Sequence, residues 1–212
     1  MKNTLLVEGN DDLHAVAALL EHYGLGNTKN AETYKPVKIE ACKGFTVVLE
    51  FLGTGFKSVN NLGVIVDADD SLNEQWNKIR AILLNKELGN VPVEFPKTGL
   101  IIDNTQEDRK RVGIWIMPNN NLNGNLETFA KTMLPDDKGL FNYAQEVVTE
   151  AKTKGADYKK QYTEKAEIYT WLAWQEEPAQ SIGRAITKSL LEPKNSQYAN
   201  DFIKWYKDLF CL

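Results

Sequence analysis

Two short apolar segments of the chain each end in acidic residues. Residues 5–7 are followed by Glu8, and residues 62–66 are followed by Asp67 and Asp69. Three carboxylates held close together repel one another strongly unless a hard divalent cation neutralises them. Mg²⁺ prefers oxygen ligands and keeps waters that substrate phosphates can replace. The sequence therefore predicts a Mg²⁺ (or Mn²⁺) site that includes Glu8, Asp67 and Asp69.

The spacing of these acids predicts that they converge on one side of the chain. Residues i and i+2 of an extended segment point to the same side, so we expect Asp67 and Asp69 to share a cation while Ala68 faces away. Ligands of parallel α/β sheets gather at the carboxyl ends of the strands. If the two apolar strands are neighbours, Glu8 joins the pair of aspartates.

Each acidic strand end leads into an amphipathic helix. We expect Gly9 to allow a sharp turn and the close approach of a substrate phosphate to the helix N-terminus. Asp11, Asp70 and Ser71 are typical N-cap residues, and capping is the role that we expect for them. For Asp12 the sequence leaves capping and a role in the site equally open.

The order of the predicted elements indicates an α/β fold. Apolar strands at 5–7, 37–41 and 62–66 alternate with helical patterns, and this order implies a mostly parallel sheet with helices on its faces. Residues 98–104 and 110–118 contain two further apolar strands that we expect to pair as a hairpin. We expect an α/β domain over 1–134 and a helical C-terminal extension over 135–212, packed on the same core. Helices of this extension are expected at 140–154, 162–175, 182–190 and 198–210.

Composition and charge limit the classes of function. The 25 Lys and Arg against 29 Asp and Glu give a net charge of −4, so no global basic field attracts nucleic acid. This charge argues against a protein that only binds DNA, but not against an enzyme that binds substrate phosphates through metal ions. Cys42 and Cys211 follow no metal-ligand spacing and suggest no disulfide framework. With no signal peptide or membrane segment expected, the sequence favours a cytoplasmic protein.

The acidic motifs resemble the Toprim domain, whose signature is a glutamate ending the first strand and a DxD ending the third. VEG at 7–9, Asp12 and VIVDADD at 64–70 carry this resemblance. Over the whole chain, including GIWIMPNNNLNGNLETF, YTWLAWQEEPAQSIGRAI and FIKWYKDLF, the sequence resembles a bacterial family of small, stand-alone Toprim-like proteins related to the OLD-family nucleases. The resemblance implies a Toprim/Rossmann-like sheet.

The resemblance also implies roles for particular residues. Glu8 corresponds to the Toprim glutamate, a general acid/base or metal ligand, and Asp67 and Asp69 correspond to the DxD ligands of Mg²⁺. Asp12 is similar to the second acidic position of OLD-type first motifs and would serve a second cation.

Two later residues are similar to positions of the OLD-type nucleases. Glu127 in GNLETF resembles a later acidic residue near the same site, although a helix N-terminal glutamate that complements the helix dipole fits it equally well. Lys165 is the candidate for a lysine that follows in the helical region of that branch, and it would act in catalysis.

These residues favour a Mg²⁺- or Mn²⁺-dependent phosphodiester hydrolase of the nuclease type. Two cations roughly 4 Å apart would activate water and stabilise the leaving oxygen of a nucleic acid. The alternative is a non-catalytic, metal-binding Toprim module that acts as a partner or regulatory subunit. The two differ in whether Asp12 and Glu127 fall near Asp67 and Asp69, because a binding module needs no second metal site.

Two other α/β classes fit less well. A glycosyltransferase DxD would not explain Glu8, and a receiver domain would leave Asp69 and the C-terminal helices without a role. The choice between DNA and RNA, a protein partner and the oligomeric state are left open by the sequence.

Overall fold

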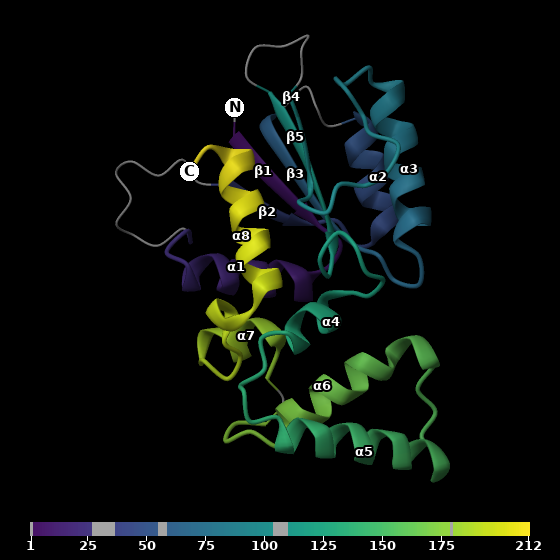
Figure 1. The fold of residues 1–212 in the computed structure, drawn as a ribbon, viewed down its shortest axis with the longest axis vertical. Helices are drawn as coiled ribbons and strands as arrows, with labels where there is room; N and C mark the ends of the chain where they lie inside the picture. The colour runs from purple at the N-terminus through teal and green to yellow at the C-terminus, as the bar shows by residue number, and fades with distance from the viewer. Residues whose placement is uncertain (1, 27–36, 55–58, 104–109, 179) are drawn as a thin grey trace.

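The computed structural model describes residues 2–26, 37–54, 59–103, 110–178 and 180–212. Its centre is a five-stranded sheet with the order β2-β1-β3-β5-β4 (Figure 1). Strands β1, β2, β3 and β5 run parallel, and β4 runs antiparallel to β5. The expected mostly parallel α/β sheet and its antiparallel strand pair are confirmed. The strands are β1 (Lys2–Val7), β2 (Val37–Ala41), β3 (Val59–Asp67), β4 (Leu100–Asp103) and β5 (Arg111–Met117).

The central strands are apolar along their length because both faces of the sheet are covered. Successive side chains alternate between the faces, so Leu5 and Ile65 enter one hydrophobic core while Leu6 and Val64 enter the other. Figure 1 shows α2 and α3 on one face and α1 and α8 on the other. The helices are α1 (Asn10–His22), α2 (Phe45–Thr54), α3 (Leu72–Asn85), α4 (Leu126–Lys131), α5 (Gly139–Thr153), α6 (Thr163–Ala173), α7 (Ile182–Thr187) and α8 (Gln197–Phe210), with 3₁₀ helices η2 (Lys160–Tyr162) and η3 (Pro193–Asn195).

The C-terminal helix α8 packs closely on the sheet through glycines of two strands. A Cβ added at Gly113 would lie 2.6 Å from Leu209 Cδ2, and one at Gly63 would lie 3.0 Å from the same atom. The absence of a side chain at these two positions lets α8 approach the backbone of β3 and β5. Helix α8 thereby covers the face of the sheet on which α1 also lies.

Helices α5 and α6 form a pair at the lower end of the molecule in Figure 1, beyond α4. The expected boundary near residue 134 falls between α4 and α5. The division into an α/β domain and an extension stays a prediction. In the described ranges, no helix is both long and apolar enough to cross a membrane.

Candidate functional site

The carboxyl ends of β1 and β3 bring Glu8 next to Asp67. The two strands are neighbours, with Leu6 opposite Val64 in parallel register. The backbone N–H of Asp67 donates to Glu8 Oε1 at 2.9 Å. The expectation that the two acidic strand ends lie side by side is confirmed.

The DxD segment is not extended throughout, although the sequence predicted that it would be. Asp69 has a φ of 48°, so the chain leaves the extended conformation at this residue. The cause is a pair of backbone hydrogen bonds with Gly124: Asp69 N donates to Gly124 O at 2.8 Å, and Gly124 N donates to Asp69 O at 2.9 Å. Ala68 is buried at this turn. Asp67 and Asp69 nevertheless line the same cavity.

The turn between β1 and α1 also differs from its expected form. Gly9 is the N-cap of α1 with φ −137° and ψ 176°, an extended conformation open to any residue. Its N–H donates to Asp12 Oδ2 at 2.9 Å, so the Asp12 side chain, rather than glycine flexibility, fixes the turn. A Cβ at Gly9 would lie 3.1 Å from that oxygen. Asp11 lies inside the helix and is not the cap that we expected.

The loop after β3 is fixed by Ser71 and by a distant asparagine. Ser71 caps α3 as expected, since its hydroxyl accepts from Glu74 N at 3.3 Å. Asp70 precedes the cap, and its carbonyl accepts from Asn123 Nδ2 at 2.7 Å. Asn123 Oδ1 in turn accepts from Leu72 N at 3.0 Å. These contacts join residues that are 51 and 53 positions apart, so no short-range pattern of the sequence predicts them.

Two adjoining cavities open beside these strand ends. The inner cavity has a volume of about 260 Å³, and acidic side chains from β3, α1 and α4 line it together with one lysine of α6. The outer cavity, of about 830 Å³, shares Asp67, Glu127 and Lys165 with it. Apart from Leu126, the inner lining is Gly9, Asn10, Asp11, Asp12, Asp67, Glu127 and Lys165.

Glu127 and Lys165 meet at the junction of the two cavities. Glu127 is 7% exposed, which is low for a carboxylate. Lys165 Nζ lies 3.4 Å from Glu127 Oε1 and 3.9 Å from Asp11 Oδ2. The structure thus brings Asp12, Asp67, Glu127 and Lys165 together in one cavity, whereas Glu8 contacts the cluster through the backbone of Asp67.

Asp67, Glu8 and Asp12 resist ionisation. Burial raises the pKa of Asp67 well above its usual value, and the charges of four other acids raise it further. Burial also raises the pKa of Glu8 to about 7, against the lowering effect of the Asp67 N–H bond and with the help of the Asp12 and Asp69 charges. The pKa of Asp12 is raised to about 6, chiefly by burial. A positive charge in this place would relieve the repulsion.

The donor chemistry of the cluster fits a hard cation. Asp67 Oδ1 is buried and has no hydrogen-bond partner among the residues that the structure describes. Glu8 and Asp12 each place one carboxylate oxygen on a backbone N–H. Within the described ranges no three His, Cys, Asp or Glu side chains form a ready-made set of cation ligands. Side-chain rotation would therefore accompany cation binding, and the buried Asp67 Oδ1 would gain its missing partner.

Tyr169 lies beside Lys165 at the site, and it was not among the candidate site residues predicted from the sequence. Lys165 Nζ lies 5.6 Å from its ring centroid, a distance at which a cation is attracted to an aromatic face. Burial and the charges of Asp11, Glu127 and Asp12 raise the pKa of Tyr169 to about 12. Its position one helical turn after Lys165 was the available signal.

An ion cluster of Lys131, Glu164 and Glu167 joins α4 to α6. Lys131 Nζ lies 3.2 Å from Glu164 Oε1 and 3.0 Å from Glu167 Oε2. Gln145 of α5 donates to Glu167 at 3.1 Å, and Thr128 of α4 donates to Glu164. The cluster fixes α6, which carries Lys165, against α4, which carries Glu127.

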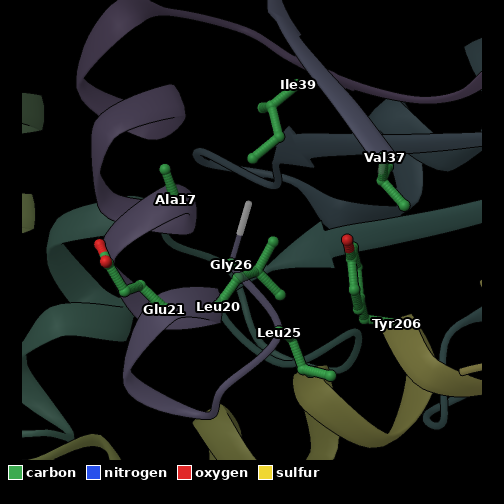
Figure 2. Close-up of a pocket in the computed structure, with 8 residues that line it drawn as sticks. All are labelled: Ala17, Leu20, Glu21, Leu25, Gly26, Val37, Ile39 and Tyr206. Atoms are coloured by element: carbon green, nitrogen blue, oxygen red, sulfur yellow. The ribbon is translucent and has the colours of Figure 1, made fainter. Parts of the chain in front are cut away.

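A further cavity of about 300 Å³ lies between α1, β2 and α8, away from the carboxylates (Figure 2). Its lining is mostly apolar, with Leu20, Val37 and Ile39 among the side chains drawn. It contains no group of carboxylates or cations comparable to the strand-end cluster. The strand-end carboxylates lie instead at the inner and outer cavities, which form the candidate site.

Comparison with known proteins gives a family for the chain. A family model described as "Protein of unknown function (DUF3226)" matches residues 2–211. The chain belongs to this family. No curated protein matches this DUF3226 member.

Two solved structures are similar to the DUF3226 chain at a low level. Both are the C-terminal region of the OLD protein of Xanthomonas campestris pv. campestris, one phased with platinum and one with mercury. Each has 17% sequence identity and a TM-score of 0.46, and the alignments cover 99% of this chain and 94% and 96% of those chains. A likeness at this level carries no argument about function.

Proposed function

We propose that the chain is a divalent-metal-dependent phosphodiester hydrolase of the nuclease type, with its centre at the inner cavity. The observation that supports this most is the position of Asp12 and Glu127, which line one cavity with Asp67 and Lys165. A single structural cation would need only the strand-end acids. Carboxylates on both sides of Asp67 supply enough oxygen ligands for a two-cation site.

The resident ions are Mg²⁺ or Mn²⁺ in this proposal. Asp67 lines one cavity with Asp12 and Glu127 and the adjoining cavity with Asp69, and its backbone N–H binds Glu8. Asp67 would be a ligand shared by the two cations, with Glu8 and Asp69 contributing to one and Asp12 and Glu127 to the other. When bound, such cations activate water and stabilise the leaving oxygen of a phosphodiester.

Glu8 and Lys165 have the properties of catalytic groups. Glu8 ends β1 beside Asp67, whose backbone N–H donates to its Oε1, and we assign it the role of general acid/base or metal ligand. Lys165 presents an ammonium group to both cavities and would stabilise negative charge on a substrate phosphate. The Glu127 carboxylate at 3.4 Å orients that ammonium group.

The assignment to the Toprim fold, on the OLD-like nuclease branch, is part of this proposal. It rests on the glutamate that ends β1, the DxD at the end of the neighbouring β3, and the later Glu127 and Lys165. The thiols of Cys42 and Cys211 are free, as is usual in a reducing compartment, and we infer that the protein acts in the cytoplasm.

The test is a cleavage assay on plasmid DNA, single-stranded DNA and RNA in Mg²⁺, Mn²⁺ or EDTA. The variants are Glu8→Gln and Asp67→Asn, and the matched control is Glu50→Gln, which changes an exposed glutamate of α2. We expect cleavage that requires the metal, is lost in both site variants and is retained in the control. Circular dichroism shows whether each variant is folded.

Absence of cleavage on every substrate would contradict the proposal. If calorimetry still detected a divalent ion that binds through Asp67, the non-catalytic metal-binding module would replace it. The net charge of −4 favours that second function, because the protein itself attracts no polyanion.

A further inference from the structure

The outer cavity extends from the carboxylates to the 3₁₀ helix η2. Asp69, Asp70 and the loop 123–125, here called the loop wall, line this space of about 830 Å³ together with residues 160–162 of η2. This volume lies within the range of pockets that bind small ligands. Because its inner end is shared with the carboxylate cavity, a chain-like ligand that fills it reaches Asp67 and Lys165.

The loop wall of the outer cavity is fixed by its own hydrogen bonds. Both ends of the Asn123 amide bond to the loop after β3. Asn125 caps α4 by accepting from Thr128 N at 3.1 Å. The oxygen and nitrogen of the Asn123 side chain and the oxygen of the Asn125 side chain are therefore already engaged within the protein.

The η2 part of the lining presents an aromatic ring and a cation that have no partners in the described part of the chain. Tyr162 is 48% exposed, and its side chain makes no ring contact or hydrogen bond there. The exposed rings of Tyr143 and Trp174, by contrast, stack on each other with centroids 5.5 Å apart. Lys160 is exposed beside Tyr162 and forms no ion pair with a described residue.

We propose that the outer cavity binds a single strand of nucleic acid, with a base stacked on Tyr162 and a phosphate held by Lys160. An aromatic platform beside a cation is the usual combination in proteins that bind single strands. The bases of a duplex are covered by their neighbours on both faces and offer no face to Tyr162. This inference rests on the proposed nucleic-acid function of the site but not on hydrolysis.

The test measures binding rather than cleavage. Fluorescence anisotropy follows a labelled oligothymidylate and a labelled duplex of equal length in Ca²⁺, which takes the same oxygen ligands as Mg²⁺. The variants are Tyr162→Ala, Tyr162→Phe and Lys160→Ala. Tyr143→Ala is the matched control, since it removes an exposed tyrosine that lies outside the cavity.

We expect the oligothymidylate to bind more tightly than the duplex. Tyr162→Ala should weaken its binding about tenfold, and Tyr162→Phe should retain it, because stacking needs the ring and not the hydroxyl. Lys160→Ala should weaken binding and reduce its salt dependence, whereas Tyr143→Ala should have no effect. Unchanged affinity in Tyr162→Ala, no binding of the oligothymidylate, or tighter binding of the duplex would overturn the inference.

Different results would contradict the proposed hydrolase and the proposed single-strand site. Loss of oligothymidylate binding in Tyr162→Ala supports the strand site whether or not any substrate is cut. Cleavage that depends on Glu8 and Asp67, together with normal binding by Tyr162→Ala, would retain the hydrolase and remove the strand site.

Discussion

At the residue scale, the acids of the site are placed where they destabilise the metal-free protein. Asp67 has a buried oxygen without a partner in the described ranges, and its pKa is raised first by burial and then by neighbouring charges. Glu8 shares this environment. Residues kept for stability alone would not be arranged in this way, and this is the physical reason for treating them as functional.

The first prediction concerns Glu8→Gln. The pKa of Glu8 is about 7 in the folded protein against 4.5 for the free group, so its ionisation costs stability as the pH rises from about 4.5 through about 7. In metal-free buffer at pH 8 we expect the substitution to raise the free energy of unfolding by about 1–3 kcal/mol. Urea denaturation measures this, and Glu50→Gln should leave stability unchanged. A destabilised Glu8→Gln protein would contradict the account.

At the element scale, the strands were predictable and the helix ends were less so. The apolar runs of β1 and β3 are long enough to show that both faces are covered. Helix α7 ends at Thr187 rather than at residue 190, because the chain turns through Ser189, which has a φ of 56°. A glycine often marks such a left-handed helix end in a sequence, but a serine does not.

The meeting of the two acidic strand ends was predictable, but the local geometry around them was not. The acids at the ends of neighbouring parallel strands follow from the order of the elements. The turn at Asp69 does not follow, since it depends on hydrogen bonds to Gly124, which is distant in sequence. The ion cluster around Lys131 is equally a product of tertiary packing. Local patterns cannot encode partners that only the folded chain brings together.

The second prediction concerns the contact between α4 and α6. Lys131→Met leaves Glu164 and Glu167 without their cation, and we expect a loss of about 2 kcal/mol in the free energy of unfolding. Lys204→Met removes an exposed ion pair with Asp208 and should cost less than about 0.5 kcal/mol. Thermal or urea unfolding compares the two variants. An equal, small loss in both would show that the Lys131 cluster does not hold the helices together.

The same substitution tests the placement of Lys165. Because α6 carries Lys165 and α4 carries Glu127, Lys131→Met should lower the cleavage rate even at temperatures where the variant is fully folded. Lys204→Met should retain the rate of the unmodified protein. Full activity in folded Lys131→Met would contradict the positioning role of the cluster.

At the scale of the whole molecule, the fold places the acidic residues at the carboxyl ends of β1 and β3. Helix α6 lies beside them and contributes Lys165 to the cavity lining. The net charge of −4 means that attraction to a polyanion has to come from bound cations and from the few lysines of the outer cavity. In the proposed metal site, stability, metal binding and pH would be linked through the same carboxylates.

The third prediction follows from this linkage. At pH 5.5 the metal-free protein keeps protons on Glu8 and Asp12, whose pKa values are about 7 and about 6. A cation must displace these protons, so Mg²⁺ should raise the melting temperature more at pH 8 than at pH 5.5. Differential scanning fluorimetry measures both shifts. An equal shift at the two pH values would show that the ion binds elsewhere.

The most direct test of the central claim is anomalous diffraction from crystals soaked in Mn²⁺. The account predicts a manganese peak at the inner cavity, with the Asp67 carboxylate among its ligands and the side chains of Glu8 or Asp12 turned toward the ion. Crystals of Asp67→Asn should lack this peak. Saturating Mn²⁺ that gives no peak at the inner cavity, or a peak that persists in Asp67→Asn, would contradict a metal centre at the ends of β1 and β3.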